Sequence, residues 1–482
     1  MKPAFNPYLP SWEYIPDGEP YVFDNRVYVY GSHDRFAGES FCLNDYVCWS
    51  APIDNLADWQ YEGVIYPKEQ DPRNPDGTRH LYAPDVQKGL DGRYYLYYAF
   101  DSMGVMSVAV CDSPAGKYTY YGTVQYPDGT AVGEKPGDIY QFDPGIFIDD
   151  DGRIFLYSGF GIGEGMEDHF GGKKADGMYC MELEADMLTV KNGPTRLIAS
   201  NIREGSMSHG FFEASSMRKI NGIYYFIYSS HLSHELCYMT SNRPDGGFEF
   251  KGTIISIGDV GYKNRPLEKR LNHLGNTHGS LVQINGQWYI FYHRQTNRHQ
   301  FSRQACAEPV TISPDGTIQQ VEVTSCGLNN GPLPGTGKYP AYIACNLFTY
   351  NHTGYNEEGS FNVMSSQDKI EDMRPYLTQD GGDRQGGEDQ YISHWKDGGV
   401  IGYKYFKLEG ASCVKVTVKG NGEGIIEMRL NMDASPLVSI PVKSGMDYQV
   451  FTGNFPPQKG VSALYFQYNG TGSLSFSAFE IT

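Results

Sequence analysis

Five short segments of the sequence place a polar side chain near the start of an apolar strand, six to nine residues before a turn that leads into a second strand. Four of the five side chains are carboxylic acids and one is a histidine, the groups that most often donate and accept protons in enzymes. Any one of them alone is more often a structural group at a turn or strand end. Their recurrence reverses that interpretation, because burying several carboxylates together is costly unless function requires it. The five residues are Glu19, Asp85, Asp143, Glu213 and His278.

A repeated motif follows each of these residues, consisting of a turn residue and then an aromatic-rich strand. Its copies begin at Asn25, Gly92, Gly152, Gly222 and Gly286, so that they are 67, 60, 70 and 64 residues apart. Each interval has room for about four strands, the size of one propeller blade. Equivalent positions in blades that close a ring meet at one end of the central channel. The spacing predicts an all-β, five-bladed β-propeller with the polar side chains in one funnel; a β-sandwich or an open solenoid would not explain this convergence.

The composition agrees with this fold class. Aromatic residues make up 14% of the chain, led by 38 Tyr, while 57 Gly and 27 Pro interrupt it, which is typical of many short strands joined by tight turns. The formal net charge of −18 repels phosphate backbones, and the sequence has no cluster of Lys and Arg, so nucleic acid is not expected as a partner. A neutral polymer such as a polysaccharide is compatible with this charge.

The cysteines and the N-terminal residues bear on the cellular location. The nine cysteines are scattered, with no CxxC pair, so neither a disulfide framework nor a zinc site is expected. Residues 1–7 contain no apolar leader segment, and no stretch approaches the roughly 18 apolar residues of a membrane span. We therefore expect a cytoplasmic protein with no membrane partner. The alternative is a secreted protein whose leader has been removed.

The length of the chain predicts two domains, since 482 residues exceed the roughly 250–300 residues at which one hydrophobic core stops growing. Residues 326–345 are rich in Gly and Pro, which is typical of a linker. Alternating apolar and polar residues in 413–418 and 425–430 predict a β-sandwich beyond it. The expected organisation is a propeller over 1–325, a linker over 326–345 and a β-sandwich over 346–482.

The ordered set of propeller motifs resembles glycoside hydrolase family 43, a family of inverting β-xylosidases, α-L-arabinofuranosidases and arabinanases. The resemblance covers about residues 5–325, and it rests on the order of the motifs at blade spacing. It implies hydrolysis in which one carboxylic acid protonates the leaving oxygen and one carboxylate activates water on the opposite face of the sugar. The motifs are Asn6-Pro7-Tyr8-Leu9-Pro10, Tyr82-Ala83-Pro84-Asp85-Val86, Phe142-Asp143-Pro144-Gly145, Phe212-Glu213-Ala214, His278-Gly279-Ser280 and Tyr292-His293-Arg294.

The resemblance implies a role for each acid. Glu213 matches the general acid, with a pKa expected to be raised by burial and neighbouring negative charge, and Asp143 matches a third carboxylate that tunes this pKa. Asp85 matches a supporting position. The position of the base departs from the family pattern. The family normally shows Asp-Pro in the first blade, but here Glu19-Pro20 stands at the corresponding position, and Asp17 lies two residues earlier. The phase of the following strand favours Glu19 as the base; Asp17 is the alternative, and a missing base is the third possibility.

Two further residues are expected at the site from the same resemblance. His278 matches the central histidine of the family, which belongs to the surroundings of a channel calcium or touches the sugar. Because calcium prefers oxygen ligands, His278 is expected to hold one of the ion's waters; the alternative is a histidine that is only hydrogen-bonded in the channel. Arg294 is expected to bind a substrate hydroxyl or to pair with a channel carboxylate. With Asp17 and Asp85, these residues form the expected substrate-binding set, and no organic cofactor is expected.

The C-terminal strands at 403–406, 426–430 and 464–468 resemble those of family 6 carbohydrate-binding modules in their order. This resemblance implies a sugar-binding accessory domain in which an aromatic face stacks on a sugar ring, and Trp395 is the best candidate for that face. A loop Trp and an acidic residue of the family are replaced here. The other interpretation is a structural sandwich that buttresses the propeller and lends a loop to the rim of its active site.

We therefore expect an exo-acting glycosidase that releases xylose or arabinofuranose from xylo-oligosaccharides or arabinoxylan fragments. Long insertions at 160–178 and 257–275 favour a walled pocket over the open groove of an endo-arabinanase, the nearest alternative. A retaining, invertase-like enzyme would need Arg-Asp-Pro and Glu-Cys motifs, which the sequence lacks. A catalytically inactive propeller that only binds glycans is the alternative from a different class, because of the unusual Glu19.

Overall fold

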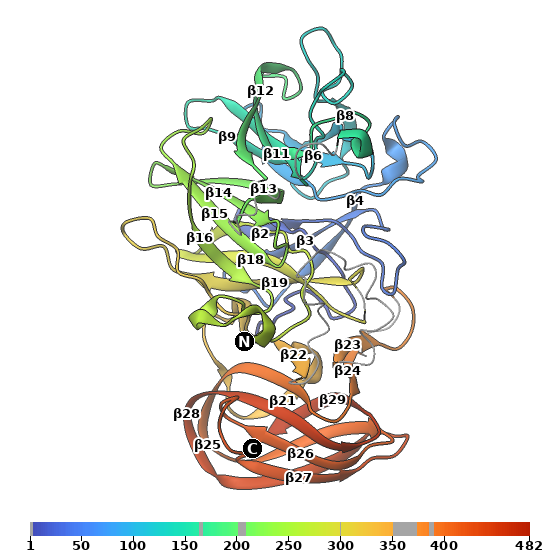
Figure 1. Cartoon of the computed structure of the whole chain (residues 1–482), viewed down its shortest axis with the longest axis vertical. Coiled ribbons are helices and arrows are strands. Elements are labelled where there is room, and N and C mark those ends of the chain that lie inside the picture. The colour runs from blue at the N-terminus through green and yellow to red at the C-terminus, as the bar shows by residue number, and fades with distance from the viewer. Residues whose placement is uncertain (1–2, 163–166, 201–208, 299, 350–373, 385–389) are drawn as a thin grey trace.

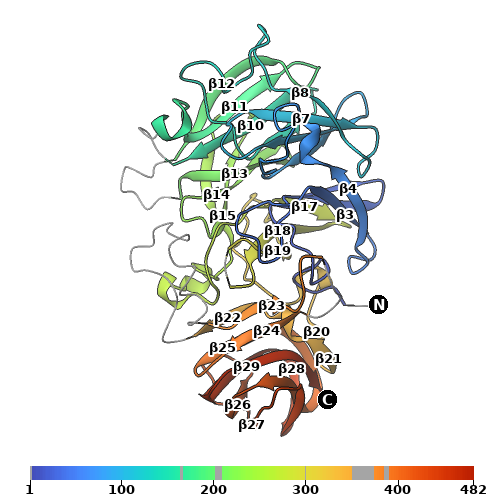
Figure 2. The same cartoon turned by 90° about the vertical axis from the view of Figure 1, so that its right-hand side faces the viewer.

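The computed structural model of the chain describes residues 3–162, 167–200, 209–298, 300–349, 374–384 and 390–482. They form a propeller and a β-sandwich that occupy opposite ends of the long axis (Figures 1 and 2). No helix in this part of the chain is long and apolar enough to cross a membrane. The described helices are short 3₁₀ turns: η1 (Lys68–Gln70), η2 (Glu167–Phe170), η4 (Tyr262–Asn264), η5 (Leu267–Lys269), η6 (Gly327–Asn329) and η7 (Ala341–Ile343).

Five antiparallel sheets make up the propeller, and the strands of each sheet are hydrogen-bonded in chain order, which confirms the predicted five blades. The first two blades contain β1 (Glu19–Phe23), β2 (Arg26–Tyr30), β3 (Tyr46–Pro52) and β4 (Gln60–Tyr66), then β5 (Asp85–Lys88), β6 (Tyr94–Ala99), β7 (Met106–Cys111) and β8 (Thr119–Thr123). The third and fourth contain β9 (Gly145–Ile148), β10 (Ile154–Gly161), β11 (Asp176–Leu183) and β12 (Val190–Ala199), then β13 (Phe211–Ile220), β14 (Ile223–Ser230), β15 (Glu235–Ser241) and β16 (Glu249–Ser256). The fifth contains β17 (Leu281–Ile284), β18 (Gln287–Gln295) and β19 (Arg303–Val310).

The second strand of each blade is the aromatic-rich strand of the sequence repeat. In β6 every residue of Tyr-Tyr-Leu-Tyr-Tyr-Ala is buried, because neighbouring blades cover both faces of the strand. The turn before this strand is tight. In the fourth and fifth blades it consists of an Asn-Gly pair with positive φ at both residues, 51° and 82° at Asn221 and Gly222, and 49° and 82° at Asn285 and Gly286. Such pairs form the type I′ turn that matches the twist of a hairpin.

Apolar clusters lie between all neighbouring blades, including the first and the last. Val29 of the first blade shares a cluster with Val282 and Phe291 of the fifth. The N-terminal segment also reaches the fifth blade, where the main-chain N–H of Tyr8 donates to the carbonyl oxygen of Ala305 at 3.2 Å. The ring is therefore closed, and the first strands of all five blades face one channel.

The C-terminal strands join into one network of hydrogen bonds, in which two long strands, β25 and β28, bend between the two layers of a sandwich. Trp395 lies in the core of this sandwich: its side chain is fully buried, and its Nε1–H donates to the Gly399 carbonyl oxygen at 2.9 Å. It therefore presents no free face to a sugar. The strands are β20 (Leu333–Pro334), β21 (Gly337–Pro340), β22 (Asn346–Thr349), β23 (Tyr376–Gln379), β24 (Gln390–Trp395), β25 (Gly399–Gly420), β26 (Glu423–Arg429), β27 (Val438–Lys443), β28 (Gln449–Thr471) and β29 (Leu474–Ile481).

The stretch 326–345, expected as a linker, is part of the sandwich. β20 pairs in parallel with β25, and β21 pairs in antiparallel with β29. Gly and Pro are compatible with these two short strands because both lie outside the central ladder, where a missing N–H donor is tolerated. The composition that suggested a linker therefore marks short outer strands of the second domain.

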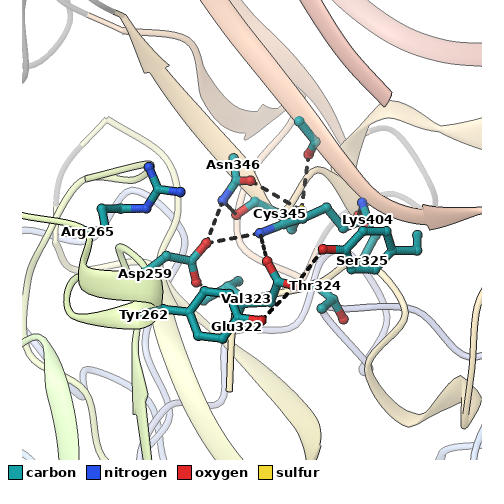
Figure 3. Close-up of polar contacts among 12 residues, drawn as sticks. Asp259, Tyr262, Arg265, Glu322, Val323, Thr324, Ser325, Cys345, Asn346 and Lys404 are labelled. Atoms are coloured by element: carbon teal, nitrogen blue, oxygen red, sulfur yellow. Dashed lines mark hydrogen bonds and ion pairs between the residues drawn. The ribbon is translucent and has the colours of Figure 1, made fainter. Parts of the chain in front are cut away.

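A buried ion pair joins the two domains (Figure 3). Lys404 of β25 is 1% exposed, and its Nζ lies 3.0 Å from Asp259 Oδ2 and 3.0 Å from Glu322 Oε2 of the propeller. The Tyr405 hydroxyl donates to the other oxygen of Glu322 at 2.5 Å. Separating such a pair would leave a buried charge without its partner, so the two domains are held in one orientation.

Candidate active site

A cavity of about 190 Å³ opens at one end of the propeller channel. It is small compared with the roughly 300–1,000 Å³ of pockets for drug-sized ligands, which suits a single sugar residue. Its wall combines three acids from three blades with aromatic rings, two amides and one arginine. The lining residues are Asp17, Phe41, Tyr82, Phe142, Asp143, Phe160, Phe212, Glu213, Asn276, Gln300 and Arg303.

Asp17 lies two residues before the start of β1, with a left-handed backbone (φ 59°) and 3% of its surface exposed. Its Oδ1 accepts a hydrogen bond from Arg303 Nη1 at 3.1 Å and lies 3.2 Å from His293 Nδ1. The backbone N–H of Asp17 donates to the same His293 nitrogen at 3.0 Å. Burial by itself raises the pKa of Asp17, but the charge of Arg303 and the contact with His293 hold this pKa well below its ordinary value. Asp17 is therefore a carboxylate.

Glu213 lies on β13 at an irregularity of the pairing with β14, and the next residue, Ala214, has a left-handed backbone (φ 70°). Burial and then the charges of Asp143 and Asp17 raise the pKa of Glu213 well above its ordinary value. Asp143 is bonded to the same short segment, since its Oδ2 accepts the backbone N–H of Ala214 at 3.0 Å. The pKa of Glu213 thus favours the protonated acid and that of Asp17 the carboxylate, and both residues line one cavity together with Asp143.

Glu19, the residue favoured as the base from sequence, does not line the cavity. It is fully buried, its Oε2 accepts hydrogen bonds from Arg218 Nη2 at 2.8 Å and Ser216 Oγ at 3.1 Å, and its Oε1 lies 3.8 Å from His278 Nε2. The Glu19 side chain is therefore buried inside the propeller, where the charge of Arg218 balances the charge of its carboxylate. The left-handed backbone at Asp17 turns the earlier acid into the cavity instead, which reverses the preference for Glu19.

Asp85 is also fully buried and outside the cavity lining. It accepts hydrogen bonds from the Tyr21 hydroxyl of the first blade at 2.7 Å and from the backbone N–H of Ile146 in the third blade at 2.8 Å. Burial and the charge of Glu19 raise the pKa of Asp85 to about 8. The residue ties three blades together around the channel, and the geometry gives it no contact with a ligand in the cavity.

His278 lies between the acids of the channel. Its Nδ1 is 3.4 Å from Asp143 Oδ2, and its Nε2 faces Glu19. Although burial lowers it, the pKa of His278 is raised to about 9 by the hydrogen bond and charge of Asp143 and by the charges of Asp17 and Glu19. The raised pKa favours the protonated ring, which lies next to Asp143 and Glu19, and His278 is not part of the cavity wall.

Arg294 does not reach the cavity: its Nη2 donates to the Ala344 carbonyl oxygen at 2.7 Å, at the junction with the second domain. The arginine of the wall is Arg303, which the sequence analysis missed. Arg303 lies on β19, the third strand of the fifth blade, whereas the repeated sequence signal marks only the first two strands of each blade. Its partner Asp34 is 269 residues away in sequence, so no local signal connects the two.

Comparisons with known proteins place the chain among carbohydrate-active enzymes. The family model described as Glycosyl hydrolases family 43 matches residues 15–318. A protein of Thermoclostridium stercorarium named xylosidase/arabinosidase is 50% identical over 487 aligned residues, which cover 100% of this chain and 99% of that protein. A solved β-xylosidase/α-arabinofuranosidase from a compost microbial metagenome, in complex with xylotriose, is 27% identical with a TM-score of 0.51, and the match covers 67% of this chain and 97% of that one. An arabinoxylan arabinofuranohydrolase structure from Bacillus subtilis, 20% identical with a TM-score of 0.50, matches 98% of this chain and 96% of its own and so resembles it in fold over both domains.

Proposed function

The chain belongs to glycosyl hydrolases family 43 and is a glycoside hydrolase with a carbohydrate substrate, and from this premise we propose that it is an inverting exo-glycosidase that releases xylose or arabinofuranose from xylo-oligosaccharides or arabinoxylan fragments. The full-length relative named xylosidase/arabinosidase supports these two sugars. The small size of the cavity supports removal of one terminal sugar at a time. Both sugars are pentoses, so one cavity can accept either of them.

The placement of Asp17 and Glu213 on the wall of one cavity is the observation that carries the mechanism, and the opposite directions of their pKa shifts suit a base and an acid. Glu213 gives its proton to the glycosidic oxygen while the bond from this oxygen to the anomeric carbon breaks. Asp17 takes a proton from a water whose oxygen forms the new bond to that carbon from the opposite face, so the configuration inverts. Loss of the proton of Asp17 to solvent and reprotonation of Glu213 complete the cycle. Asp143 keeps Glu213 protonated through its charge and orients it through the bond to Ala214.

Arg303 has two parts in this proposal. Its bond to Asp17 keeps the base ionised, and as a member of the cavity wall it can bind a sugar hydroxyl. The aromatic residues of the wall exclude water other than the attacking molecule and offer faces to the sugar ring. We assign substrate binding to Arg303 in place of Arg294.

Calcium belongs to the same proposal as a bound ion of the channel. Glu19 Oε1 and His278 Nε2 are buried and have no hydrogen-bond partner in the described structure, and they lie 3.8 Å apart. A carboxylate oxygen is a ligand that calcium accepts, and a bound cation would favour the neutral form of His278, whose free ring nitrogen can accept a hydrogen bond from one of the ion's waters. The ion would add positive charge beneath the acids. Calcium added to EDTA-treated protein should raise the Tm and restore activity; an unchanged Tm and activity would exclude this site.

A cytoplasmic location is also part of the proposal. All nine cysteines are free thiols, and seven of them are buried, which suits a reducing compartment. Detection of the protein outside the cytosolic fraction of its cells would contradict it.

The hydrolysis of 4-nitrophenyl β-D-xylopyranoside and 4-nitrophenyl α-L-arabinofuranoside, followed by proton NMR of the first product formed, tests the function. We expect both substrates to be cleaved and the anomeric configuration of the product to be inverted. Retention of configuration, or cleavage of linear arabinan without cleavage of either glycoside, would contradict the proposal.

A further inference from the structure

A loop of the β-sandwich leaves its own domain and lies against the first blade of the propeller. This loop follows β23, and its described part ends at Arg384. Asp383 makes two hydrogen bonds to the propeller: Oδ1 accepts the backbone N–H of Phe36 at 2.7 Å, and Oδ2 accepts from Asn44 Nδ2 at 3.0 Å. A single carboxylate thus connects both ends of the propeller segment 36–44.

The neighbours of Asp383 hold the same blade. Arg384 Nη1 donates to Glu13 Oε2 at 2.7 Å, and its guanidinium lies 5.2 Å from the ring centre of Trp12. Gln379 Oε1 accepts from the Tyr14 hydroxyl at 2.7 Å. These contacts anchor the loop to residues that precede Asp17, while Asp383 anchors it to the segment that follows β2.

The propeller segment held by Asp383 forms part of the active site. Phe41 lines the cavity, and the guanidinium carbon of Arg303 lies 4.7 Å from its ring centre. Asp34, next to the segment, is fully buried, and its Oδ2 accepts from Arg303 Nε at 2.8 Å while its Oδ1 accepts from Nη2 at 3.0 Å. Arg303 in turn reaches Asp17. A continuous series of contacts therefore connects the second domain with the cavity. It leads from Asp383 through the segment 36–44 and Arg303 to Asp17.

This segment lies between β2 and β3 and has no strand pairing of its own. Ala37 and Cys42 adopt left-handed backbones, with φ of 54° and 58°. Non-glycine residues keep such conformations only where surrounding contacts impose them. The two bonds to Asp383 hold the segment together with bonds inside the propeller: Cys42 N–H donates to Asp34 Oδ1 at 3.0 Å, Ala37 N–H to Ser302 Oγ at 3.1 Å and Asn44 N–H to the His33 carbonyl oxygen at 3.0 Å.

We propose that the β-sandwich completes the active site from a distance, and that Asp383 is a positioning residue that holds Phe41, Asp34 and, through them, Arg303 in place beside Asp17. This inference rests on the proposed function, since it assigns the base to Asp17. It gives the second domain a role in hydrolysis that requires no sugar binding by the sandwich.

The test compares Asp383→Ala with Asp380→Ala in the full-length protein. Asp380 is an acid of the same loop whose contacts with described residues lie in the sandwich: Oδ1 accepts from the Tyr391 hydroxyl at 3.0 Å, and Oδ2 lies 3.9 Å from Lys419 Nζ. Asp383→Ala should lower kcat/KM for the two aryl glycosides roughly 10- to 100-fold, the cost of a small misplacement of catalytic groups. Asp380→Ala should stay within about twofold of wild type, and Asp383→Asn, which keeps one acceptor oxygen, should fall between them.

Two measurements separate positioning from a general loss of stability. In Asp383→Ala the acid limb of the kcat/KM–pH profile should move to higher pH. A displaced Arg303 no longer holds the pKa of Asp17 as low as in wild type, although His293 and His278 remain in place. Amide hydrogen exchange over residues 33–44 should also become faster, while exchange in the other blades stays unchanged. An acid limb and an exchange pattern identical to those of Asp380→Ala would overturn the proposal. If wild type cleaves neither glycoside, the proposed function fails, and the exchange data still decide whether Asp383 holds the segment.

Discussion

Replacing Asp17 with asparagine tests the assignment of the base most directly. The two side chains have nearly the same shape, so the cavity keeps its size, but an amide cannot accept a proton from water. Arg303 keeps both hydrogen bonds to Asp34 and should stay in the wall. Loss of general base catalysis typically costs about 10²- to 10⁴-fold in rate, which is about 2.7–5.4 kcal/mol of transition-state stabilisation. We expect this loss in kcat with KM changed little, because substrate binding does not depend on proton transfer.

Glu19→Gln is the matched control for Asp17→Asn. It removes a carboxylate only two residues away, but from a site outside the cavity and bonded to Arg218. We expect Glu19→Gln to lower the Tm, because Arg218 loses its buried partner, and to lower kcat no further than removal of calcium by EDTA does, well short of the loss in Asp17→Asn. Steady-state kinetics on 4-nitrophenyl β-D-xylopyranoside, with circular dichroism to confirm folding, provide the readout. A 10²-fold loss of kcat in Glu19→Gln together with near-normal turnover in Asp17→Asn would refute the reasoning from the geometry.

Three further predictions concern the remaining acids. Glu213→Gln should lower kcat about 10²- to 10⁴-fold on xylo-oligosaccharides but much less on aryl glycosides, whose leaving group needs little protonation; equal losses on both substrates would contradict a general acid role. Asp143→Asn removes a charge that raises the pKa of Glu213, so the alkaline limb of the kcat–pH profile should move to lower pH, and an unmoved limb would argue against this coupling. Asp85 has a pKa raised to about 8 in the folded state from an ordinary value near 3.8, so the folded state holds a proton that unfolding releases, and stability falls as the pH rises through this window. Between pH 5 and pH 8 the Tm of wild type should therefore fall relative to that of Asp85→Asn by on the order of 5 °C, and parallel Tm curves would show that Asp85 ionises normally.

The sequence alone was sufficient for the architecture of the first domain and for two of the three acids in the cavity. The repeat of aromatic strands is set by short-range physics, since a tight turn and buried tyrosines recur in each blade, and the turn is an Asn-Gly pair in the fourth and fifth. Residues at the same position of each sequence repeat occupy the same position in each blade of a closed ring. The sequence therefore predicted that Asp143 and Glu213 lie together, and both line the cavity. The β-sandwich followed in the same way from the alternation of apolar and polar residues.

Tertiary structure decided which first-blade acid enters the cavity, which arginine accompanies it, and what the second domain does. Asp17 and Glu19 are two residues apart, and strand phase would place both on one side, but a left-handed backbone at Asp17 separates their directions. Arg303 reaches Asp17 and Asp34 only because the ring closes between the last blade and the first. Asp383 contacts the segment near Asp34 only because the sandwich docks on that blade. Local patterns determine elements and their phase, whereas contacts between residues hundreds of positions apart depend on how the elements close and dock, which no local pattern encodes.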